Sequence, residues 1–385
     1  MREGWEYKRL GELCDIVMGQ SPMGNSINEN NGIEFHQGKT NFGDKFLMES
    51  GIYTTSPIRI AEKKTILLCV RAPVGIINIT ERQVCIGRGL SSLKPRLGLE
   101  LLYLYYCLLS KQNYFESNST GSTFKAISSK VINNTIIQFP SKSTQLSIVS
   151  ELDKLNELIR IKKEQLKDYD TLAQSIFYEM FGDPVENEKG WEVKKLGELC
   201  SKIGSGATPR GGNESYKDEG ISLIRSLNVY NNEFRRKDLA YIDDEQAAAL
   251  SNVTILEDDV LLNITGASVA RCCIVPSDLL PARVNQHVCI IRPFDNVLVP
   301  IFLNKVLTNI SYQIRLLTLA RSKGATREAL PKSVVDSLLV PLPPLSLQQS
   351  FAHKIEQIER QKAEVQKTIT DLETLLAARM QYWFD

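Results

Sequence analysis

Short, glycine-containing stretches of the chain carry side chains that can read the edges of nucleic-acid bases. Arginine can donate two hydrogen bonds to guanine, and asparagine or glutamine can pair with adenine through one donor and one acceptor. Lysine and hydroxyl side chains can bind phosphate oxygens and fix the register of a duplex. The candidate DNA-contacting residues are Gln37, Lys39, Asn41, Arg71, Arg88, Ser122, Thr123, Lys125, Arg210, Arg225, Asn228, Gln286, Lys323 and Thr326.

Each candidate also has a simpler interpretation, because loop residues of these types are more often solvated or form turns. Arg71, Arg88 and Arg225 are the strongest of the set, since each interrupts an apolar, strand-like context or lies between glycines. The run 235–237 (Arg-Arg-Lys) is expected to be a solvated face, with a phosphate clamp as the alternative.

Residues arranged for catalysis are missing from the sequence. Amino methylation of a flipped base would need a [DNS]-P-P-[YFW] tetrapeptide, and segment 342–345 (Leu-Pro-Pro-Leu) fails at both ends. Segment 38–40 (Gly-Lys-Thr) resembles the end of a phosphate-binding loop, but the preceding Gly32 is one residue too far away. A PD-(D/E)-x-K nuclease pattern is also absent. We therefore expect a chain without an active site.

Metal binding is not expected either. The histidines His36, His287 and His353 have no metal-ligand spacing and are expected to be structural or at the surface. No two cysteines form a C-x-x-C pair, and most lie in apolar runs, so we expect buried free thiols. The eight cysteines are Cys14, Cys69, Cys85, Cys107, Cys200, Cys272, Cys273 and Cys289.

Composition indicates a globular chain with room for two domains of ordinary size. The chain has 385 residues, 43% of them hydrophobic, and no apolar run reaches the roughly 18 residues of a membrane span. The first residues lack the apolar stretch of a secretory signal, so we expect a cytoplasmic location. The net charge of +1 hides differences in charge between segments, since residues 1–143 carry 17 Lys and Arg against 12 Asp and Glu. Attraction to phosphate must therefore come from local clusters.

Two long helices are expected to position the candidate residues. Each shows a seam of apolar residues that steps alternately by four and three, and every position of the second seam is the first plus 203. Such a seam is typical of a coiled coil. The first seam is Ile148, Leu152, Leu155, Ile159, Lys162, Leu166, Tyr169, Ala173, Ile176 and Met180, and the second is Phe351, Ile355, Ile358, Lys362, Val365, Ile369, Leu372, Leu376, Arg379 and Trp383.

The globular segments ahead of these helices are also duplicated. Residues 4–14 and 190–200 are identical at nine of eleven positions, with Gly-Trp-Glu at the start and Leu-Gly-Glu-Leu-Cys at the end. Each half then has strand-like runs, such as 65–70 and 259–264, and a helix-like segment, at 100–110 or 299–308. Two further pairs follow at an offset of 203: a G-[SA]-T-x-x-A-[IL] segment from Gly121 or Gly324, and a P-x-x-S-x-Q segment from Pro140 or Pro343.

These patterns predict an α+β chain with a pseudo-two-fold internal repeat. Two globular α/β domains, at 1–143 and 183–345, are expected to be separated by two long antiparallel coiled-coil helices, at 144–182 and 346–385. Cations in the seams either fix the register or extend to solvent. Aromatic residues at the helix ends either pack on the adjacent globular half or dock a partner. These docking candidates are Phe177, Tyr178, Phe181, Tyr382, Trp383 and Phe384.

The whole layout resembles the DNA-specificity (S) subunit of type I restriction-modification systems. The resemblance rests on the duplicated lead-ins, the two G-[SA]-T-x-x-A-[IL] segments and the two P-x-x-S-x-Q segments. It implies a non-catalytic subunit in which each globular half is a target-recognition domain for one half of a split site in double-stranded DNA. It also implies that the helices act as a ruler and dock two methyltransferase subunits, which bind S-adenosylmethionine, with restriction subunits joining in the full complex.

Two alternatives remain open from the sequence. One is a coiled-coil scaffold whose globular halves bind proteins. The other is a self-contained methyltransferase-nuclease, which the missing catalytic motifs disfavour.

Overall fold

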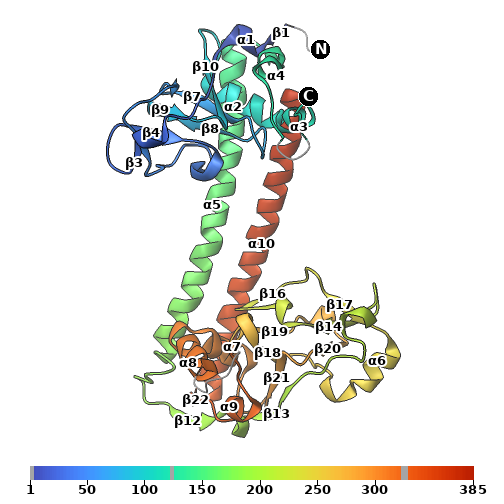
Figure 1. The fold of residues 1–385 in the computed structure, drawn as a ribbon. Coiled ribbons are helices and arrows are strands. Elements are labelled where there is room, and N and C mark those ends of the chain that lie inside the picture. Colours follow the sequence, from blue (N-terminus) through green and yellow to red (C-terminus); the bar gives the residue numbers. More distant parts are fainter. Residues whose placement is uncertain (1–3, 122–124, 322–327) are drawn as a thin grey trace. The chain divides into compact units, whose positions relative to one another are not determined.

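The computed structural model describes residues 4–121, 125–321 and 328–385 (Figure 1). The chain folds into two compact units: unit 1 is Met1–Glu164 with Gln366–Asp385, and unit 2 is Gln165–Val365. Helices α5 (Lys142–Phe181) and α10 (Leu345–Phe384) each contribute residues to both units. Each unit therefore combines one globular segment with part of each long helix.

Unit 1 is built on two sheets of four and five strands, and a separate pair, β1 with β11, joins its first and last strands. The first sheet is antiparallel, in the order β2 (Cys14–Met18), β10 (Leu90–Pro95), β7 (Thr65–Cys69) and β8 (Ile77–Thr80). The second has the order β3 (Ile27–Asn28), β5 (Tyr53–Thr54), β4 (Ile33–His36), β9 (Val84–Ile86) and β6 (Ile60–Ala61). The remaining elements are β1 (Glu6–Arg9), β11 (Ile136–Phe139), α1 (Leu10–Leu13), α2 (Leu101–Ser110), α3 (Gln112–Ser117) and α4 (Ser129–Asn134).

Unit 2 repeats this plan with a different smaller sheet. Its four-stranded antiparallel sheet has the order β13 (Cys200–Ser205), β21 (Val288–Pro293), β18 (Val260–Asn263) and β19 (Cys272–Ile274). A three-stranded sheet has the order β17 (Ala240–Ile242), β14 (Ile221–Ile224) and β20 (Ala282–Val284). The remaining elements are β12 (Glu192–Lys195), β15 (Val229–Tyr230), β16 (Glu233–Phe234), β22 (Leu339–Leu342), α6 (Asp244–Ala249), α7 (Pro300–Thr308), α8 (Ile310–Arg321) and α9 (Lys332–Asp336).

Strand β7 shows why the apolar runs of the sequence form central strands. All five of its residues are buried. Alternate side chains of a strand point to opposite faces, and here both faces are covered. Ile66 and Leu68 join the larger core with α2, whereas Leu67 and Cys69 join a smaller core beneath the five-stranded sheet. Strand β18 of unit 2 divides its side chains between two cores in the same way.

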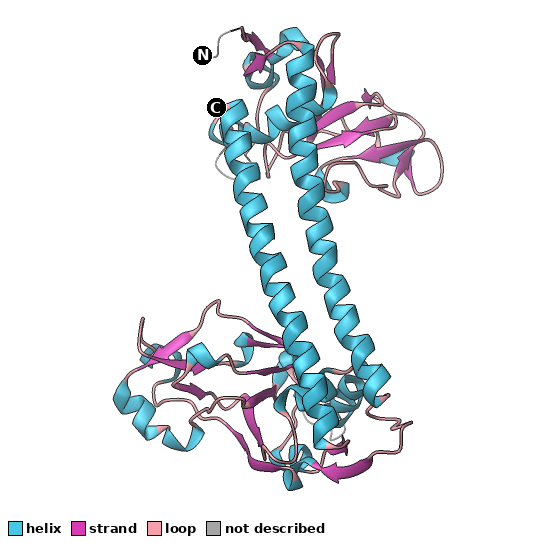
Figure 2. Ribbon diagram, turned by 180° about the vertical axis from the view of Figure 1, so that it is seen from behind, coloured by secondary structure: helices cyan, strands magenta, loops and turns pink. Residues whose placement is uncertain are grey.

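The long helices run antiparallel within each unit. In unit 1, Glu151 pairs with Arg379, and Lys163 pairs with Glu373 at 2.7 Å. A later residue of α5 thus contacts an earlier residue of α10, so the two helices are antiparallel. In unit 2, Asp170 pairs with Lys362 at 2.8 Å, and Phe177 contacts Phe351, with ring centroids 5.7 Å apart. The predicted coiled-coil pairing is confirmed, and both helices are continuous (Figure 2).

The helices bury the predicted seams. In α10, every seam position from Phe351 to Trp383 is buried or half-buried. Two seam cations are engaged across the helix pair, because Lys362 binds Asp170 and Arg379 binds Glu151. The positions of α5 that correspond to Lys362 and Arg379 are occupied by isoleucine. Each of these two ion pairs therefore occurs in one unit and is not repeated in the other.

A buried glutamine fixes the start of each long helix. In unit 1, Gln145 Oε1 accepts a hydrogen bond from the Glu100 backbone N–H at 2.9 Å. Its Nε2 donates to the backbone carbonyls of Gly98 and Pro140, both at 3.0 Å. Because Glu100 precedes α2, the side chain joins the starts of two helices. This is the glutamine of the first P-x-x-S-x-Q segment.

The second P-x-x-S-x-Q segment makes the same three bonds. Gln348 Oε1 accepts from the Val299 N–H at 2.9 Å, and its Nε2 donates to the carbonyls of Val297 and Pro343. Both glutamine side chains are fully buried. The repeated motif therefore reflects one structural requirement, met once in each unit.

Replacing Gln145 with leucine should destabilise unit 1. The substitution leaves one backbone donor and two carbonyls without their partner, at a cost of about 1–3 kcal/mol for a buried unsatisfied group. Gln348→Leu should have a similar effect in unit 2, whereas Gln174→Leu, at an exposed position of α5, should change little. Urea unfolding would measure the three effects. Equal stability of the Gln145→Leu and Gln174→Leu proteins would contradict this role.

Candidate nucleic-acid interface

Two parallel strands in each unit bring candidate loops together. In unit 1, β4 pairs with β9, and the Gly87 N–H donates to the His36 carbonyl at 2.8 Å where both strands end. Gln37 and Arg88 are the next residues of the two segments. In unit 2, β14 pairs with β20, and the Asn285 N–H donates to the Ile224 carbonyl at 3.0 Å. Arg225 and Gln286 follow there in the same way.

A third segment joins them from the central strand of the larger sheet. After β7, the Val70 N–H donates to the Gly89 carbonyl at 2.9 Å. After β18, the Ile264 N–H donates to the His287 carbonyl at 3.0 Å. Arg71 and Thr265 therefore lie beside the paired loops of their units.

A fourth segment completes the arrangement. The Ala72 N–H donates to the Lys125 carbonyl at 3.1 Å, and the Gly266 N–H donates to the Glu328 carbonyl at 3.0 Å. We call this place the loop edge. It is formed by positions 37, 71, 88 and 125 in unit 1 and by positions 225, 265, 286 and 328 in unit 2.

Close backbone packing holds the loop edge in both units. A Cβ atom on Gly19 would lie 2.2 Å from the Gly87 carbonyl oxygen, and one on Gly206 would lie 2.1 Å from the Val284 oxygen. Only glycine fits so close to another backbone. Gly19 follows the first duplicated lead-in, at residues 4–14, and Gly206 follows the second, at residues 190–200.

The loop edge of unit 1 presents polar side chains to solvent. Gln37, Arg71, Arg88 and Lys125 are exposed. Among the described residues, the side chains of Arg71, Arg88 and Lys125 make no hydrogen bond or ion pair, whereas Arg82 and Arg96 of the same unit are paired with carboxylates. Cations without a carboxylate partner are available for phosphate or base contacts.

A buried charged cluster supports the residue before Gln37. Arg82 binds the Glu34 carboxylate at 2.6 Å, and His36 Nε2 lies 3.0 Å from the same carboxylate. Burial alone would raise the pKa of Glu34, but hydrogen bonds from Arg82 and the Ser50 N–H outweigh it and lower that pKa to about 2. Burial lowers the pKa of His36, and Glu34 opposes this shift. These contacts fix the end of β4. They support the prediction that His36 has a structural role.

The other unit 1 candidates differ in accessibility. Lys39 is exposed, whereas Asn41 is half-buried and donates to the Glu49 carbonyl at 3.1 Å. The remaining candidates lie in the two G-[SA]-T segments or directly before the second one, and all are outside the described residues: Ser122, Thr123, Lys323 and Thr326.

In unit 2 the candidates divide into exposed and internal residues. Arg210 and Gln286 are exposed. Arg225 is half-buried, donates to the Asp238 carbonyl and lies over the Tyr216 ring. Asn228 is fully buried, and its amide donates to the carbonyls of Arg235 and Lys237, so it shapes the loop from inside.

The basic run at 235–237 is largely engaged within unit 2. Arg235 binds Glu233 at 3.0 Å and lies 3.5 Å from the centre of the Tyr230 ring. Arg236 binds Asp278 at 2.9 Å. These contacts support the interpretation as a solvated face.

Thr265 and Glu328 of the unit 2 loop edge, and His287 next to it, were not among the candidate residues. Thr265 Oγ1 lies 2.6 Å from His287 Nδ1, so the two side chains are coupled. His287 directly follows the candidate Gln286, and it was expected to be structural or at the surface. An alignment of residues 87–90 with 285–288 would have identified position 287. The sequence does not suggest this alignment, because the side chains of the two segments share no similarity.

The aromatic docking candidates are mostly internal. Phe177 and Phe181 lie in the main core of unit 2, and Phe384 lies in that of unit 1. Tyr178 is half-buried and reaches Asn309, with 3.4 Å between the Tyr178 hydroxyl and Asn309 Oδ1. For these four residues the structure supports packing within the unit.

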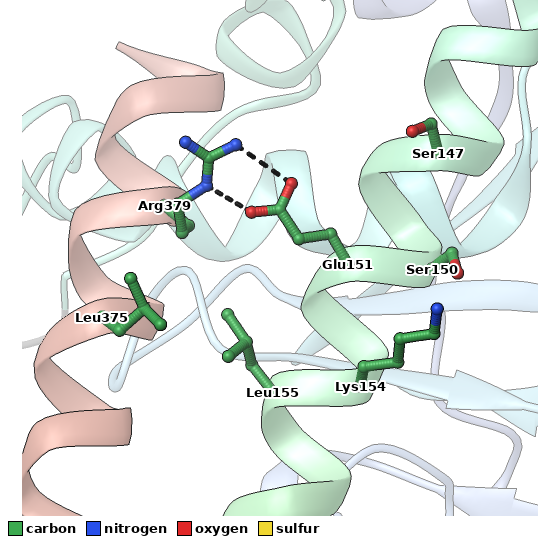
Figure 3. Close-up of a pocket in the computed structure, with 7 residues that line it drawn as sticks. All are labelled: Ser147, Ser150, Glu151, Lys154, Leu155, Leu375 and Arg379. Atoms are coloured by element: carbon green, nitrogen blue, oxygen red, sulfur yellow. Dashed lines mark hydrogen bonds and ion pairs between the residues drawn. The ribbon is translucent and has the colours of Figure 1, made fainter.

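Tyr382 and Trp383 are more accessible. Tyr382 is 54% exposed. Trp383 donates to Glu151 at 3.1 Å and stacks on Trp5, with ring centroids 6.2 Å apart. Nearby, a groove of about 530 Å³ runs between α5 and α10, and the Glu151–Arg379 pair spans it (Figure 3). Part of the helix pair in unit 1 is therefore accessible.

The described residues contain no cluster of side chains with the geometry of a metal site. All eight cysteines are buried free thiols, and burial raises the pKa of Cys14 and Cys69 to about 12. Within the described parts of the chain, no helix is both long and apolar enough to span a bilayer.

Three specificity subunits of type I restriction enzymes are similar to parts of this chain in sequence. The putative type I restriction enzyme MjaX specificity subunit of Methanocaldococcus jannaschii is 34% identical over 178 residues, which are 45% of this chain and 42% of the relative. The MjaIX specificity subunit of the same organism is 28% identical over 236 residues, 53% of each chain. The EcoBI specificity subunit of Escherichia coli is 22% identical over 295 residues, 70% of this chain and 61% of the relative. The chain thus spans about half the length of the two M. jannaschii relatives.

Solved structures show the same fold. An S subunit of a type I restriction-modification system from M. genitalium aligns with a TM-score of 0.57 at 17% identity, covering 99% of this chain and 96% of that one. A chain from a structure that describes complex assembly and conformational transition of the type I R-M system aligns with a TM-score of 0.67 at 18% identity, covering 100% and 98%.

The family model for the type I restriction modification DNA specificity domain matches the chain twice, at residues 2–168 and 188–374. The two matches coincide with the two repeats and together cover most of the chain. The chain therefore belongs to the family of type I restriction-modification DNA specificity proteins, of which it carries two domain copies.

Proposed function

We propose that the chain is a DNA-reading subunit and that each loop edge contacts one half of a bipartite site in double-stranded DNA. The supporting observation is the duplicated loop edge itself. Equivalent backbone hydrogen bonds hold both edges, yet the side chains differ: Gln37, Arg71 and Arg88 in unit 1 correspond to Arg225, Thr265 and Gln286 in unit 2. The same backbone arrangement thus presents two different sets of hydrogen-bond donors and acceptors, which suits the recognition of two different base sequences.

In this proposal the chain carries no catalytic step and binds no cofactor. Two methyltransferase subunits with S-adenosylmethionine would dock on it and methylate adenines in the two half-sites, in the cytoplasm. Restriction subunits would join the complete complex. The accessible groove and Tyr382 in unit 1 are the proposed contacts for one methyltransferase subunit.

A binding experiment tests this function against a scaffold that binds only proteins. The chain, purified with a methyltransferase subunit from the same organism, would be used to select duplexes from a random pool. We expect the complex to retard selected duplexes far more strongly than random ones at physiological salt, since specific binding exceeds non-specific binding by about 10³-fold or more. Equal retardation of both would support the scaffold.

Arg88→Ala should relax the preference at one base pair of the half-site contacted by unit 1. Loss of a bidentate arginine contact costs about 1–3 kcal/mol of discrimination against the wrong base. Arg96→Ala is the matched control, because Arg96 follows β10 at the end away from Arg88 and is bound to Asp15. Competition binding with single-base variants would measure the effect. The assignment fails if both variants keep the wild-type preference.

Lengthening both long helices should lengthen the gap between the half-sites. A seven-residue insertion after Glu164 and another after Val365 preserve the heptad and add about 10.5 Å to each helix. At about 3.4 Å per base pair, the tolerated gap should grow by about three base pairs while the half-sites stay the same. Methylation-sensitive sequencing would report the gap. An unchanged gap in a folded, active complex would contradict the ruler.

Tyr382→Ala should weaken binding of the methyltransferase subunit without unfolding the chain. Truncating a tyrosine that is a hot spot of an interface costs more than about 1 kcal/mol, at least about a fivefold loss of affinity. Gln381→Ala is the control, since Gln381 is its exposed neighbour on α10. Calorimetric titration would compare the two affinities, and a thermal melt would check folding. Equal affinity for both variants would remove Tyr382 from the interface.

A further inference from the structure

The two loop edges can be compared residue by residue, because the same backbone bonds define them. The Gly87 N–H to His36 carbonyl bond corresponds to the Asn285 N–H to Ile224 carbonyl bond. It follows that Arg88 and Gln286 hold equivalent places, and that the next residues are Gly89 in unit 1 and His287 in unit 2. At this place, next to the loop edge, the side chain changes from a hydrogen atom to an imidazole.

In unit 1 the place after Arg88 admits no side chain. A Cβ atom on Gly89 would lie 2.2 Å from the Gln37 carbonyl oxygen. Arg88 therefore has no side chain directly behind it, and its guanidinium makes no hydrogen bond among the described residues. A guanidinium group does not need a neighbouring side chain to orient its donors relative to one another, since all five are fixed in one plane.

In unit 2 the equivalent place holds an imidazole with neighbours on both ring nitrogens. His287 Nε2 lies 3.3 Å from Gln286 Nε2, and His287 Nδ1 lies 2.6 Å from Thr265 Oγ1. If the Gln286 amide donates to Nε2, the proton of the neutral ring is on Nδ1 and is donated to the Thr265 hydroxyl. Thr265, His287 and Gln286 then form a continuous hydrogen-bonded chain.

This chain determines what the Gln286 amide has left to offer. A carboxamide has two N–H donors and one carbonyl acceptor. With one N–H bound to His287, the second N–H and the carbonyl oxygen remain, which are the two groups that contact N7 and the N6 amino group of adenine. Gln286 is exposed, so both groups are accessible to a duplex.

We propose that Gln286 reads an adenine in the half-site contacted by unit 2, and that His287 and Thr265 are positioning residues that hold its amide. The inference rests on the proposed function of DNA reading. It makes position 286 specific for an A·T pair, whereas the equivalent Arg88 of unit 1 has the fork that suits guanine.

Single-base substitution across the selected duplex tests the proposal, with the chain assembled with its methyltransferase subunit. For the wild-type complex, we expect one A·T pair of the unit 2 half-site whose replacement weakens binding about ten- to a hundredfold. Gln286→Ala should reduce that preference to less than threefold. His287→Ala and Thr265→Val should reduce it several-fold, while Thr265→Ser, which keeps the hydroxyl, should retain it.

Arg71→Val is the matched control, because Arg71 holds the place of Thr265 in unit 1. It should leave the preference at this A·T pair unchanged. Thr265→Val that behaves like Thr265→Ser would overturn the positioning role, and an unchanged preference in Gln286→Ala would overturn the adenine contact. A wild-type complex without sequence preference would overturn the proposed function together with this inference.

Discussion

Burial of the aromatic end of a long helix is the contact on which each unit depends. In unit 2, Phe181 at the end of α5 packs against Phe302 and Phe351, with ring centroids 4.7 and 5.2 Å away. In unit 1, Phe384 at the end of α10 packs against Tyr103, and its carbonyl accepts from Gln138 at 2.9 Å. Fully burying one phenylalanine contributes about 1.5–3 kcal/mol. Each globular core therefore includes residues from both repeats.

This constraint explains which parts of the repeat are alike and which differ. The lead-in segments, the glutamine motifs and the helix ends form the cores and the helix starts, where a change of side chain leaves a cavity or an unpaired group. The loop edges have less restriction, because none of their side chains is fully buried: those of unit 1 and Gln286 are exposed, and the others of unit 2 are half-buried. Gln37 can correspond to Arg225, and Arg88 to Gln286, without disturbing the backbone bonds beneath them.

The fold was largely predictable from the sequence because it rests on periodic burial. The strand-like runs at 65–70 and 259–264 are β7 and β18, and the helix-like segments at 100–110 and 299–308 contain α2 and α7. The seams of α5 and α10 are buried as predicted. The smaller sheets were not predicted, since their strands of two to four residues carry too short a pattern.

The site was only partly predictable. The candidate loops, which are far apart in the sequence, were chosen by residue type, but their convergence depends on the parallel pairing of β4 with β9 and of β14 with β20. Residue type also cannot separate exposed from internal side chains. Asn228 and Arg88 have equally suitable chemistry, yet Asn228 is buried inside its loop while Arg88 is exposed. The role proposed for Thr265 and His287 depends on the 2.6 Å contact between them, which the sequence does not show.

We have proposed that one chain reads two unlike half-sites with its two loop edges. To test this, cells would express one methyltransferase subunit either with or without this chain, and single-molecule sequencing would map the methylated adenines in their DNA. We predict a single methylated motif that depends on the chain and has two different fixed halves separated by a gap of constant length. A continuous motif, two identical halves, or methylation that persists without the chain would contradict the account.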